Sequence, residues 1–388
     1  MKLSRRNFIK TAAASAGVVA AGAALTACGG NSSSSSDSSS SSDEKIPLTI
    51  GYWGGNCCEL AVYVAIENGC FEKAGIEPNI VTITADTAEL LANDEIDFFL
   101  STPGFFMYYL QGVNLRLIDT MHTGCWSGMT IEGRGIETSK DLAGKKVGTS
   151  SVTHPAYVEA NAMCARLGGD PSTIEWVIYD GSLLLEALTS GEVDAIIGID
   201  SSLYPQVKET ENSKFFFISA QDLGDYYCCF LGMNSNTLDN VEGAGDALAT
   251  AFAEAVDILR SDVDAAVEMA IEKGYTAGDY PDIEKGLAGN YLYSHGNEDD
   301  FKTSIKERFQ ELYDCGMLAD YAPADESEVD AWLDELTDGF GEWHGDVADA
   351  AEPLADQVKE RGDAYGTDAS VLQEAEKSEG NGTAALND

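Results

Sequence analysis

Glu186-Ala187-Leu188-Thr189-Ser190-Gly191-Glu192-Val193-Asp194-Ala195 joins the end of an expected helix to a buried strand through a tight turn. The pattern occurs a second time, because residues 89–98 (ELLANDEIDF) align with residues 186–195 without a gap. Apolar residues at helical spacing before the turn and a short apolar run after it predict a helix followed by a strand. Similar turn chemistry in unrelated units would also explain the match. One copy in each half favours two similar α/β lobes that face one another.

The segments around these copies continue the alternation of strand and helix, which is typical of parallel sheets. Strands are expected at residues 47–53, 80–83, 96–100, 144–148, 174–179, 193–199 and 226–233, and helices at 59–69, 87–92, 155–167 and 182–189. Beyond residue 233 apolar residues recur three and four positions apart, which predicts helices at 247–259, 263–272, 283–291, 301–313 and 329–336. A folded part of about 320 residues from Lys45 onward suits two lobes better than one core.

The N-terminal residues predict export and lipid attachment. Ser4 to Lys10 (SRRNFIK) has the form of a twin-arginine signal, an apolar stretch follows, and Leu25 to Cys28 (LTAC) has the small-residue pattern of a lipoprotein cleavage site. The apolar stretch is too short and too rich in Ala and Gly for a membrane span. We therefore expect a signal peptide at residues 1–27, a palmitate-type lipid on Cys28 and a Ser-rich tether at residues 28–45. The alternative is an ordinary secretory signal with a chance cysteine, against which the serine run at residues 32–42 argues.

The charge of the chain narrows its partners. The net charge is −43, with 23 basic and 66 acidic residues. Removal of residues 1–27 leaves 19 basic residues and a net charge of −47. Such a chain excludes nucleic acid and repels anionic surfaces, so we expect membrane contact through the lipid anchor only. The polar residues 362–388 are expected to be a disordered acidic tail.

Cysteine usage leaves two interpretations open. Apart from Cys28 there are eight cysteines, with adjacent pairs at residues 57–58 and 228–229 and no C-x-x-C spacing. Disulfides suit an extracytoplasmic protein. Buried free thiols are the alternative, because twin-arginine export moves chains that have already folded in a reducing cytosol.

Four motifs together carry a resemblance to a known family. They are residues 65–76 (AIENGCFEKAGI), Glu95-Ile96-Asp97, residues 141–148 (DLAGKKVG) and residues 187–195 (ALTSGEVDA). In this order, and behind a lipoprotein signal, they resemble the substrate-binding lipoproteins of ABC importers in the nitrate, sulfonate, taurine and thiamine-precursor group. The resemblance covers residues 48–318, and Ile96 replaces the valine of the family pattern.

The resemblance implies the fold class α/β of the type II periplasmic-binding-protein fold. This fold has two lobes with mixed, mainly parallel sheets, joined by a two-segment hinge, here with a helical C-terminal extension. Lobe one would combine residues 46–134 with residues 226–361, and lobe two would be residues 135–225. The hinge would pass through Gly133-Arg134-Gly135 and Gly224-Asp225, and the ligand would lie between the closing lobes.

Candidate ligand-binding residues follow from the rule that ligands of open α/β sheets bind beyond the carboxyl ends of the strands. Four strand ends supply Tyr52, Trp53, Asn56 and Cys57; Ser101 and Thr102; Thr149, Ser150, Ser151, Thr153 and His154; and Asp200 and Ser201. Each has a structural alternative: Trp53 as a core residue, and the hydroxyls, His154 and Asp200 as helix caps or structural residues. These loops contain no Lys or Arg, so we expect a neutral or zwitterionic ligand with an aromatic group against Trp53, Tyr52 or Trp126 rather than a simple anion.

The sequence does not predict an enzyme. G-x-S-x-G, P-loop and H-E-x-x-H patterns are absent from it, and we expect no catalytic residues, no cofactor and no metal. Cys228-Cys229-Phe230 resembles part of the Cys-Cys-Cys-Phe-Cys run of pyrimidine-synthesising enzymes, but buried structural cysteines are the preferred interpretation. A metal or haem site built from Cys57, Cys58, Cys228, Cys229 and His154 is the alternative.

These observations predict an extracytoplasmic solute-binding protein of an ABC importer. It would be a monomer that captures a small molecule of the nitrate, sulfonate or taurine type, or of the pyrimidine or aromatic type, and delivers it to permease and ATPase subunits. A lipoprotein sensor that presents the same ligand to a signalling receptor is the competing class, because both need the same cleft.

Overall fold

The computed structural model describes residues 45–150, 154–219, 227–318, 326–343, 350–353 and 356–357. Within these residues the strands form two mixed sheets of five strands each. The first, in lobe one, has the order β2-β1-β3-β10-β4, made by Ile76–Thr82, Ile46–Tyr52, Phe98–Ser101, Tyr227–Met233 and Arg116–Thr123. The second, in lobe two, has the order β7-β6-β8-β5-β9, made by Glu175–Ile178, Lys146–Thr149, Ala195–Ile199, Trp126–Ile131 and Ser213–Ile218. Each sheet has two parallel and two antiparallel pairings, so the antiparallel share is larger than expected.

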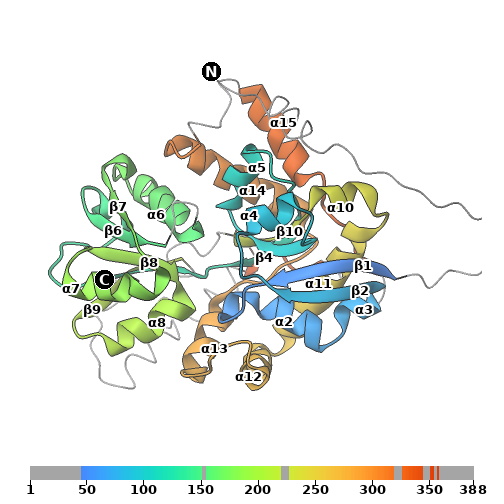
Figure 1. Cartoon of the computed structure of the whole chain (residues 1–388), viewed down its shortest axis with the longest axis horizontal. Helices are drawn as coiled ribbons and strands as arrows, with labels where there is room; N and C mark the ends of the chain where they lie inside the picture. The colour runs from blue at the N-terminus through green and yellow to red at the C-terminus, as the bar shows by residue number, and fades with distance from the viewer. Residues whose placement is uncertain are drawn as a thin grey trace, which may run out of the picture.

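Helices surround both sheets (Figure 1). Lobe one has α2 (Leu60–Glu67), α3 (Cys70–Lys73), α4 (Thr87–Ala92), α5 (Phe105–Leu110) and α10 (Ser235–Asn240), followed by the C-terminal helices α11 (Ala244–Ser261), α12 (Val263–Lys273), α13 (Pro281–Asn290), α14 (Glu298–Asp314) and α15 (Glu326–Thr337). Lobe two has α6 (Pro155–Arg166), α7 (Leu184–Ser190) and α8 (Asp200–Glu209). The five helices expected beyond residue 233 are therefore present, and the short α10 is a further helix that the sequence did not predict.

The repeated sequence pattern forms the same structure in both lobes. Asp94 (φ 55°) and Gly191 (φ 85°) occupy equivalent positions and turn the chain out of α4 and α7 in the left-handed conformation. Three residues later, the carboxylate Oδ2 of Asp97 accepts a hydrogen bond from the Thr49 amide at 2.7 Å. Asp194 Oδ2 accepts the equivalent bond from the Lys146 amide at 2.9 Å. The acidic residue after each turn thus ties the new strand to its parallel neighbour.

The chain crosses from the first sheet to the second earlier than expected. β4 ends at Thr123 and β5 begins at Trp126 in the other sheet, so Gly124 and Cys125 form the crossing. The boundary at residues 134 and 135 is therefore wrong. The Gly133-Arg134-Gly135 segment lies within lobe two, where the Arg134 guanidinium donates to the backbone carbonyls of Leu188, at 2.7 Å, and Val193. The other expected crossing, Gly224-Asp225, lies outside the described residues.

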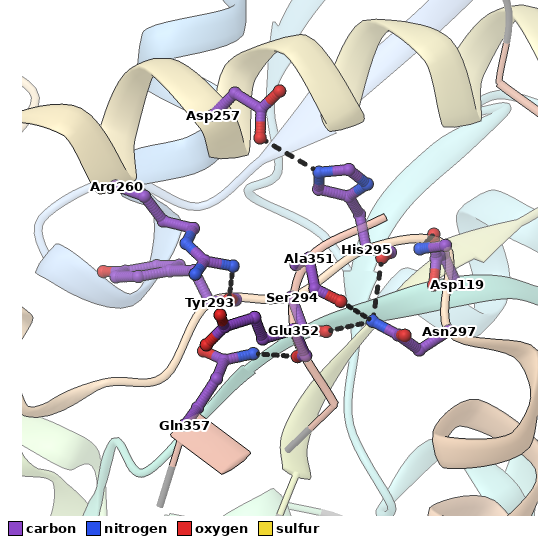
Figure 2. A network of polar contacts seen from close by, with 11 residues as sticks. Asp119, Asp257, Arg260, Tyr293, Ser294, His295, Asn297, Ala351, Glu352 and Gln357 are labelled. Carbon is purple, nitrogen blue, oxygen red and sulfur yellow. Dashed lines mark hydrogen bonds and ion pairs between the residues drawn. The ribbon is translucent and has the colours of Figure 1, made fainter. Parts of the chain in front are cut away.

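The C-terminal helices contact both lobes. α13 packs against α8 of lobe two, and α14 and α15 pack against β4 of lobe one (Figure 1). Figure 2 shows how a late segment is attached: the side-chain amide of Asn297 donates to the Ala351 carbonyl at 2.6 Å and to the His295 carbonyl at 3.1 Å. The residue before Asn297 attaches the same loop to lobe one, because the amide of Gly296 donates to Asp119 Oδ2 of β4 at 2.7 Å.

No helix among the described residues is long and apolar enough to cross a membrane. The predicted signal peptide, Cys28, the tether up to residue 44 and the tail 362–388 lie outside the described residues.

Candidate functional site

A cavity of about 450 Å³ lies between the lobes. Its walls come from both lobes and include residues beyond the carboxyl ends of β1, β2 and β3, together with Trp126 at the amino end of β5. Four of the expected site residues line it: Trp53, Asn56 and Thr102 from lobe one and His154 from lobe two. The expected aromatic residue Trp126 lines it as well, and so does Ser202, which follows the expected Ser201 in the chain.

The loop after β1 is shaped by a buried carboxylate. Glu59 is 1% exposed, and its two oxygens accept hydrogen bonds from the amides of Trp53 at 2.9 Å and Gly54 at 2.7 Å, while Tyr63 donates its hydroxyl at 3.1 Å. Gly54 and Gly55 both have φ near 80°, a conformation in which only glycine is unstrained. Burial raises the pKa of Glu59, and the two amide hydrogen bonds oppose that rise. Glu59 therefore positions the loop without lining the cavity.

Aromatic rings form much of the wall. Trp53 lies 6.5 Å from Phe105 between ring centroids, and both line the cavity together with Tyr108. On the opposite lobe Trp126 meets the His154 ring edge to face at 5.9 Å. Such an arrangement of flat faces suits a planar ligand.

Two buried polar atoms of the wall have no hydrogen-bond partner among the described residues. They are Thr102 Oγ1 and Trp126 Nε1. A buried donor or acceptor that lacks a partner is unfavourable by about 1–3 kcal/mol, so a bound molecule that satisfies both atoms gains affinity. The pair offers one hydroxyl, able to donate or accept, and one N–H donor.

The electrostatics of the cavity do not favour an anion. Among the described residues that line it there is no Lys or Arg, and the single carboxylate is Asp86, whose Oδ1 caps α4 by accepting from the Ala88 amide at 2.9 Å. His154 caps α6 through Nδ1, which accepts from the Ala156 amide at 3.1 Å. Burial lowers the pKa of His154 to about 4, so the imidazole is neutral near pH 7.

The remaining described candidates do not line this cavity; they are Tyr52, Cys57, Ser101, Thr149, Ser150, Asp200 and Ser201. Asp200 instead connects the lobes, because its Oδ1 accepts a hydrogen bond from the Tyr291 hydroxyl at 2.5 Å. Burial raises the pKa of Asp200 to about 6, and the Tyr291 hydrogen bond opposes that rise. Tyr52 packs edge to face on Tyr63 and Tyr275. Ser151 and Thr153 lie outside the described residues.

Sequence reasoning missed part of the wall. Ala85, Asp86 and Thr87 follow β2 and line the cavity, as do Phe105 and Tyr108 of α5. The first three could have been found, because they follow the carboxyl end of the expected strand 80–83. The two aromatic residues could not, since nothing in a buried helical run indicates which ring faces a cavity.

Two cysteines are among the residues that line the cavity. Cys58 and Cys229 line it, and all eight cysteines among the described residues are free thiols in the structure. Cys229 belongs to a group with His122, Cys125 and Cys228 whose possible ligand atoms all lie within 4.8 Å of one another. This group differs from the ligand set of the alternative metal site, because Cys57, Cys58 and His154 are not in it. Cys57 lies 3.6 Å from the Tyr291 hydroxyl instead.

Two lobes around a common cavity define the class of periplasmic-binding-protein folds, and solved structures share this fold. The chain superposes on the periplasmic nitrate-binding protein NrtA of Synechocystis PCC 6803 with a TM-score of 0.60 at 12% identity, covering 85% of this chain and 91% of that one. The periplasmic aliphatic sulphonate binding protein SsuA of Escherichia coli gives a TM-score of 0.58 at 15% identity, covering 74% and 98%.

Sequence comparison identifies the family. Residues 58–266 match the family described as NMT1/THI5 like, and the chain belongs to it. The chain is also 26% identical over 159 residues to the 4-amino-5-hydroxymethyl-2-methylpyrimidine phosphate synthase of Schizosaccharomyces pombe. That match covers 38% of this chain and 43% of the synthase.

Proposed function

We propose that this protein is an extracytoplasmic solute receptor of an ABC importer, which captures a small planar molecule between its lobes and delivers it to a membrane permease. The observation that carries the proposal is the interlobe cavity of about 450 Å³ with aromatic walls. A cavity of this size holds a small ring compound. Nitrate-binding and sulphonate-binding proteins among the solved structures share the fold and support the transport role.

The ligand class follows from the charges of the wall. A receptor for nitrate or a sulfonate would gain from a cation in the cavity, and the lining residues that the structure describes supply no Lys or Arg. A neutral or zwitterionic heteroaromatic compound, such as an aminopyrimidine, would stack on Trp53 or Trp126 and bond to Thr102 Oγ1 and Trp126 Nε1. The match to a pyrimidine phosphate synthase supports this ring class, whereas the cavity contains no group set that we assign to catalysis. We propose binding without chemical change.

A ligand screen tests the proposal. Calorimetry and thermal shift with aminopyrimidines, other heteroaromatic compounds, taurine, alkanesulfonates, nitrate and bicarbonate should show tight binding for the heteroaromatic set, because a ligand held by the closed lobes stabilises the folded state. Tight binding of taurine or nitrate alone would overturn the ligand class. A screen in which nothing binds would contradict the receptor, and turnover of a bound compound would establish an enzyme.

A matched pair of variants locates the site. Trp126→Phe removes a cavity N–H donor and part of a ring face, and we expect affinity for the bound heteroaromatic compound to fall roughly 5–30-fold. Trp176→Phe is the control, because Trp176 also has a buried Nε1 without a partner among the described residues but lies outside the cavity wall. If the two variants lose affinity for the compound equally, the ligand binds elsewhere.

The export and membrane attachment of the chain are also part of the proposal. We propose twin-arginine export and lipid attachment at Cys28, which would keep the receptor near its permease. Replacement of Arg5 and Arg6 by Lys should leave the chain inside the cell, and Cys28→Ser should release it from the membrane fraction. Ligand-stimulated ATPase activity with a permease in vesicles would distinguish transport from the alternative of a lipoprotein sensor.

A further inference from the structure

Four potential metal ligands from three parts of the chain come together beside the cavity. His122 is on β4, Cys125 is in the crossing between the lobes, and Cys228 and Cys229 are on β10. We call these four residues the sulfur cluster. Each side chain is at most 1% exposed, and one potential ligand atom from each lies within 4.8 Å of all the others. Cys229 also lines the interlobe cavity, but the proposed capture of a solute assigns no role to the thiols or the imidazole.

Two backbone irregularities bring the sulfur atoms together. Consecutive residues of a regular strand point to opposite faces of a sheet. The pairing of β10 with β4 shifts register on both sides of Cys229, and the thiols of Cys228 and Cys229 lie only 3.5 Å apart. Cys125 has a φ of 75°, which is rare for a residue with a side chain, and its Sγ lies 3.0 Å from that of Cys228. Backbone irregularities that converge on one point are typical of functional sites.

The distances match a tetrahedral ion. Zinc bonds of ~2.3 Å to sulfur and ~2.0 Å to nitrogen require tetrahedral edges of about 3.8 Å between sulfurs and about 3.5 Å between sulfur and nitrogen. Here Cys125 Sγ is 3.7 Å from Cys229 Sγ, Cys228 Sγ is 3.5 Å from Cys229 Sγ, and Cys228 Sγ is 3.7 Å from His122 Nδ1. Of these four pairs only Cys125 and Cys228, at 3.0 Å, must move apart, and the other pairs of ligand atoms lie within 4.8 Å of each other.

Backbone carbonyls hold both nitrogens of the His122 ring, and coordination would keep one of these two contacts. The ring stacks on Tyr291 at 4.9 Å, and its Nε2 lies 2.9 Å from the Cys58 carbonyl oxygen, to which an Nε2–H donates. Such a bond to the outer nitrogen is what usually fixes a metal-binding histidine. Nδ1 lies 2.9 Å from the Thr123 carbonyl oxygen, to which an Nδ1–H donates in the metal-free chain, so coordination through Nδ1 requires release of that proton and loss of this hydrogen bond.

From this geometry we infer that the sulfur cluster is a binding site for one Zn²⁺ or a similar thiophilic ion. Cys125, Cys228 and Cys229 would bind as thiolates, each releasing its proton to solvent, and His122 would bind through Nδ1. Three sulfurs and one imidazole are a common zinc ligand set. Because Cys229 also lines the interlobe cavity, an ion can reach the cluster from there. The ion would fix the crossing segment to β10 of lobe one.

Cobalt titration tests the site directly. The intact chain, purified in detergent under anaerobic reducing conditions and stripped with a chelator, is titrated with Co²⁺ and then with Zn²⁺. We expect thiolate charge-transfer absorption and the intense visible bands of tetrahedral Co²⁺, saturating at a single equivalent and disappearing when Zn²⁺ displaces the cobalt. Zn²⁺ should also raise the melting temperature.

Variants assign the ligands. Cys228→Ser and Cys125→Gly should each weaken Co²⁺ binding by about 100-fold or more, since ligand loss exceeds the effect of losing an outer-shell partner. Glycine suits the φ of 75° at residue 125, so loss of binding there would not reflect misfolding. Cys164→Ser and Cys315→Ser are controls at free thiols outside the cluster and should leave the spectrum unchanged.

Three results would overturn the inference. The first is a cobalt spectrum without thiolate charge transfer. The second is binding that survives both Cys125→Gly and Cys228→Ser. The third is a disulfide between Cys125 and Cys228 in protein taken from cells with its thiols trapped at once, because those sulfurs would then not be available to an ion. None of these results bears on the ligand screen, so failure here and failure of the proposed receptor function are separable.

Discussion

Glu59 shows how a single buried carboxylate shapes the cavity. It accepts hydrogen bonds from the amides of Trp53 and Gly54, two half-buried residues, and these amides lose that partner without it. We expect Glu59→Ala to lower the free energy of unfolding by about 2–4 kcal/mol, because each unpaired buried donor is unfavourable by about 1–3 kcal/mol. Urea unfolding measures the effect. Glu89→Ala, at an exposed carboxylate on α4, is the control, and a similar loss in both variants would refute the positioning role.

His154 makes stability depend on pH. Burial lowers its pKa from 6.5 to about 4 in the folded chain. Between these values the unfolded state binds more protons, so this group lowers the free energy of unfolding as the pH falls from about 6.5 to 4. The contribution approaches about 2–3 kcal/mol at the acid end.

The test compares pH profiles of the free energy of unfolding. His154→Asn should remove this part of the acid loss while keeping a side chain that caps α6 well. Taking the difference between the two profiles removes the contribution of other groups that titrate in the same window, such as Asp200. Parallel profiles for the two proteins would show that His154 titrates normally in the folded state.

At the scale of elements, the contact of α13 with α8 holds the lobes together across the cavity. The Tyr291 hydroxyl at the end of α13 donates to Asp200 at the start of α8. Tyr291→Phe should lower the free energy of unfolding by about 1–3 kcal/mol, because it leaves a buried carboxylate with one fewer donor. Its loss should also raise the pKa of Asp200 further, since that hydrogen bond opposes the effect of burial.

Tyr293 provides a matched control for this contact. It is buried nearby, and its hydroxyl has no hydrogen-bond partner among the described residues. Tyr293→Phe should therefore change the free energy of unfolding by less than about 0.5 kcal/mol, as removal of an unpaired hydroxyl is close to neutral. Equal destabilisation by both variants would mean that the rings, not the interlobe hydrogen bond, carry the effect.

The second sheet depends on close contact between β5 and β9. A Cβ atom added at Gly128 would lie 2.2 Å from the Phe216 ring, whereas one added at Gly181 meets nothing within 4 Å. Gly128→Ala should destabilise the chain by about 1–3 kcal/mol through overpacking. Gly181→Ala should be neutral or slightly stabilising. Denaturant midpoints compare the two, and an unchanged midpoint for Gly128→Ala would show that Phe216 moves aside freely.

For the whole molecule, the sequence predicted the repeated helix–strand units and the strand ends that meet at the cavity. It missed β4, β5 and β9. Asp119 and His122 interrupt the apolar pattern of β4, and both β4 and β5 pair with strands distant in sequence, so no local signal marks them. The crossing was misplaced because Gly133 and Gly135 resemble a hinge. The crossing at Gly124 and Cys125 lies between two strands that the sequence did not reveal.

The sulfur cluster illustrates the same limit at the site. Cys228 and Cys229 stand out in the sequence, but their partners His122 and Cys125 are about a hundred positions away in the chain. Only the sheet order, with β10 beside β4, brings them together. Spacing rules for metal sites depend on ligands that are near in sequence, so they could not have selected this set.

Net charge leads to a final prediction for the molecule as a whole. With 66 acidic and 23 basic residues, repulsion among carboxylates should outweigh surface ion pairs such as Lys302 with Glu298, whose side chains are half exposed. The Debye length falls from ~30 Å at 0.01 M salt to ~8 Å at 0.15 M, so added salt should screen the long-range repulsion first. We expect the melting temperature to rise over this range, equally in NaCl and KCl. A fall would mean that attractive ion pairs dominate, and a rise with only one cation would indicate specific binding rather than screening.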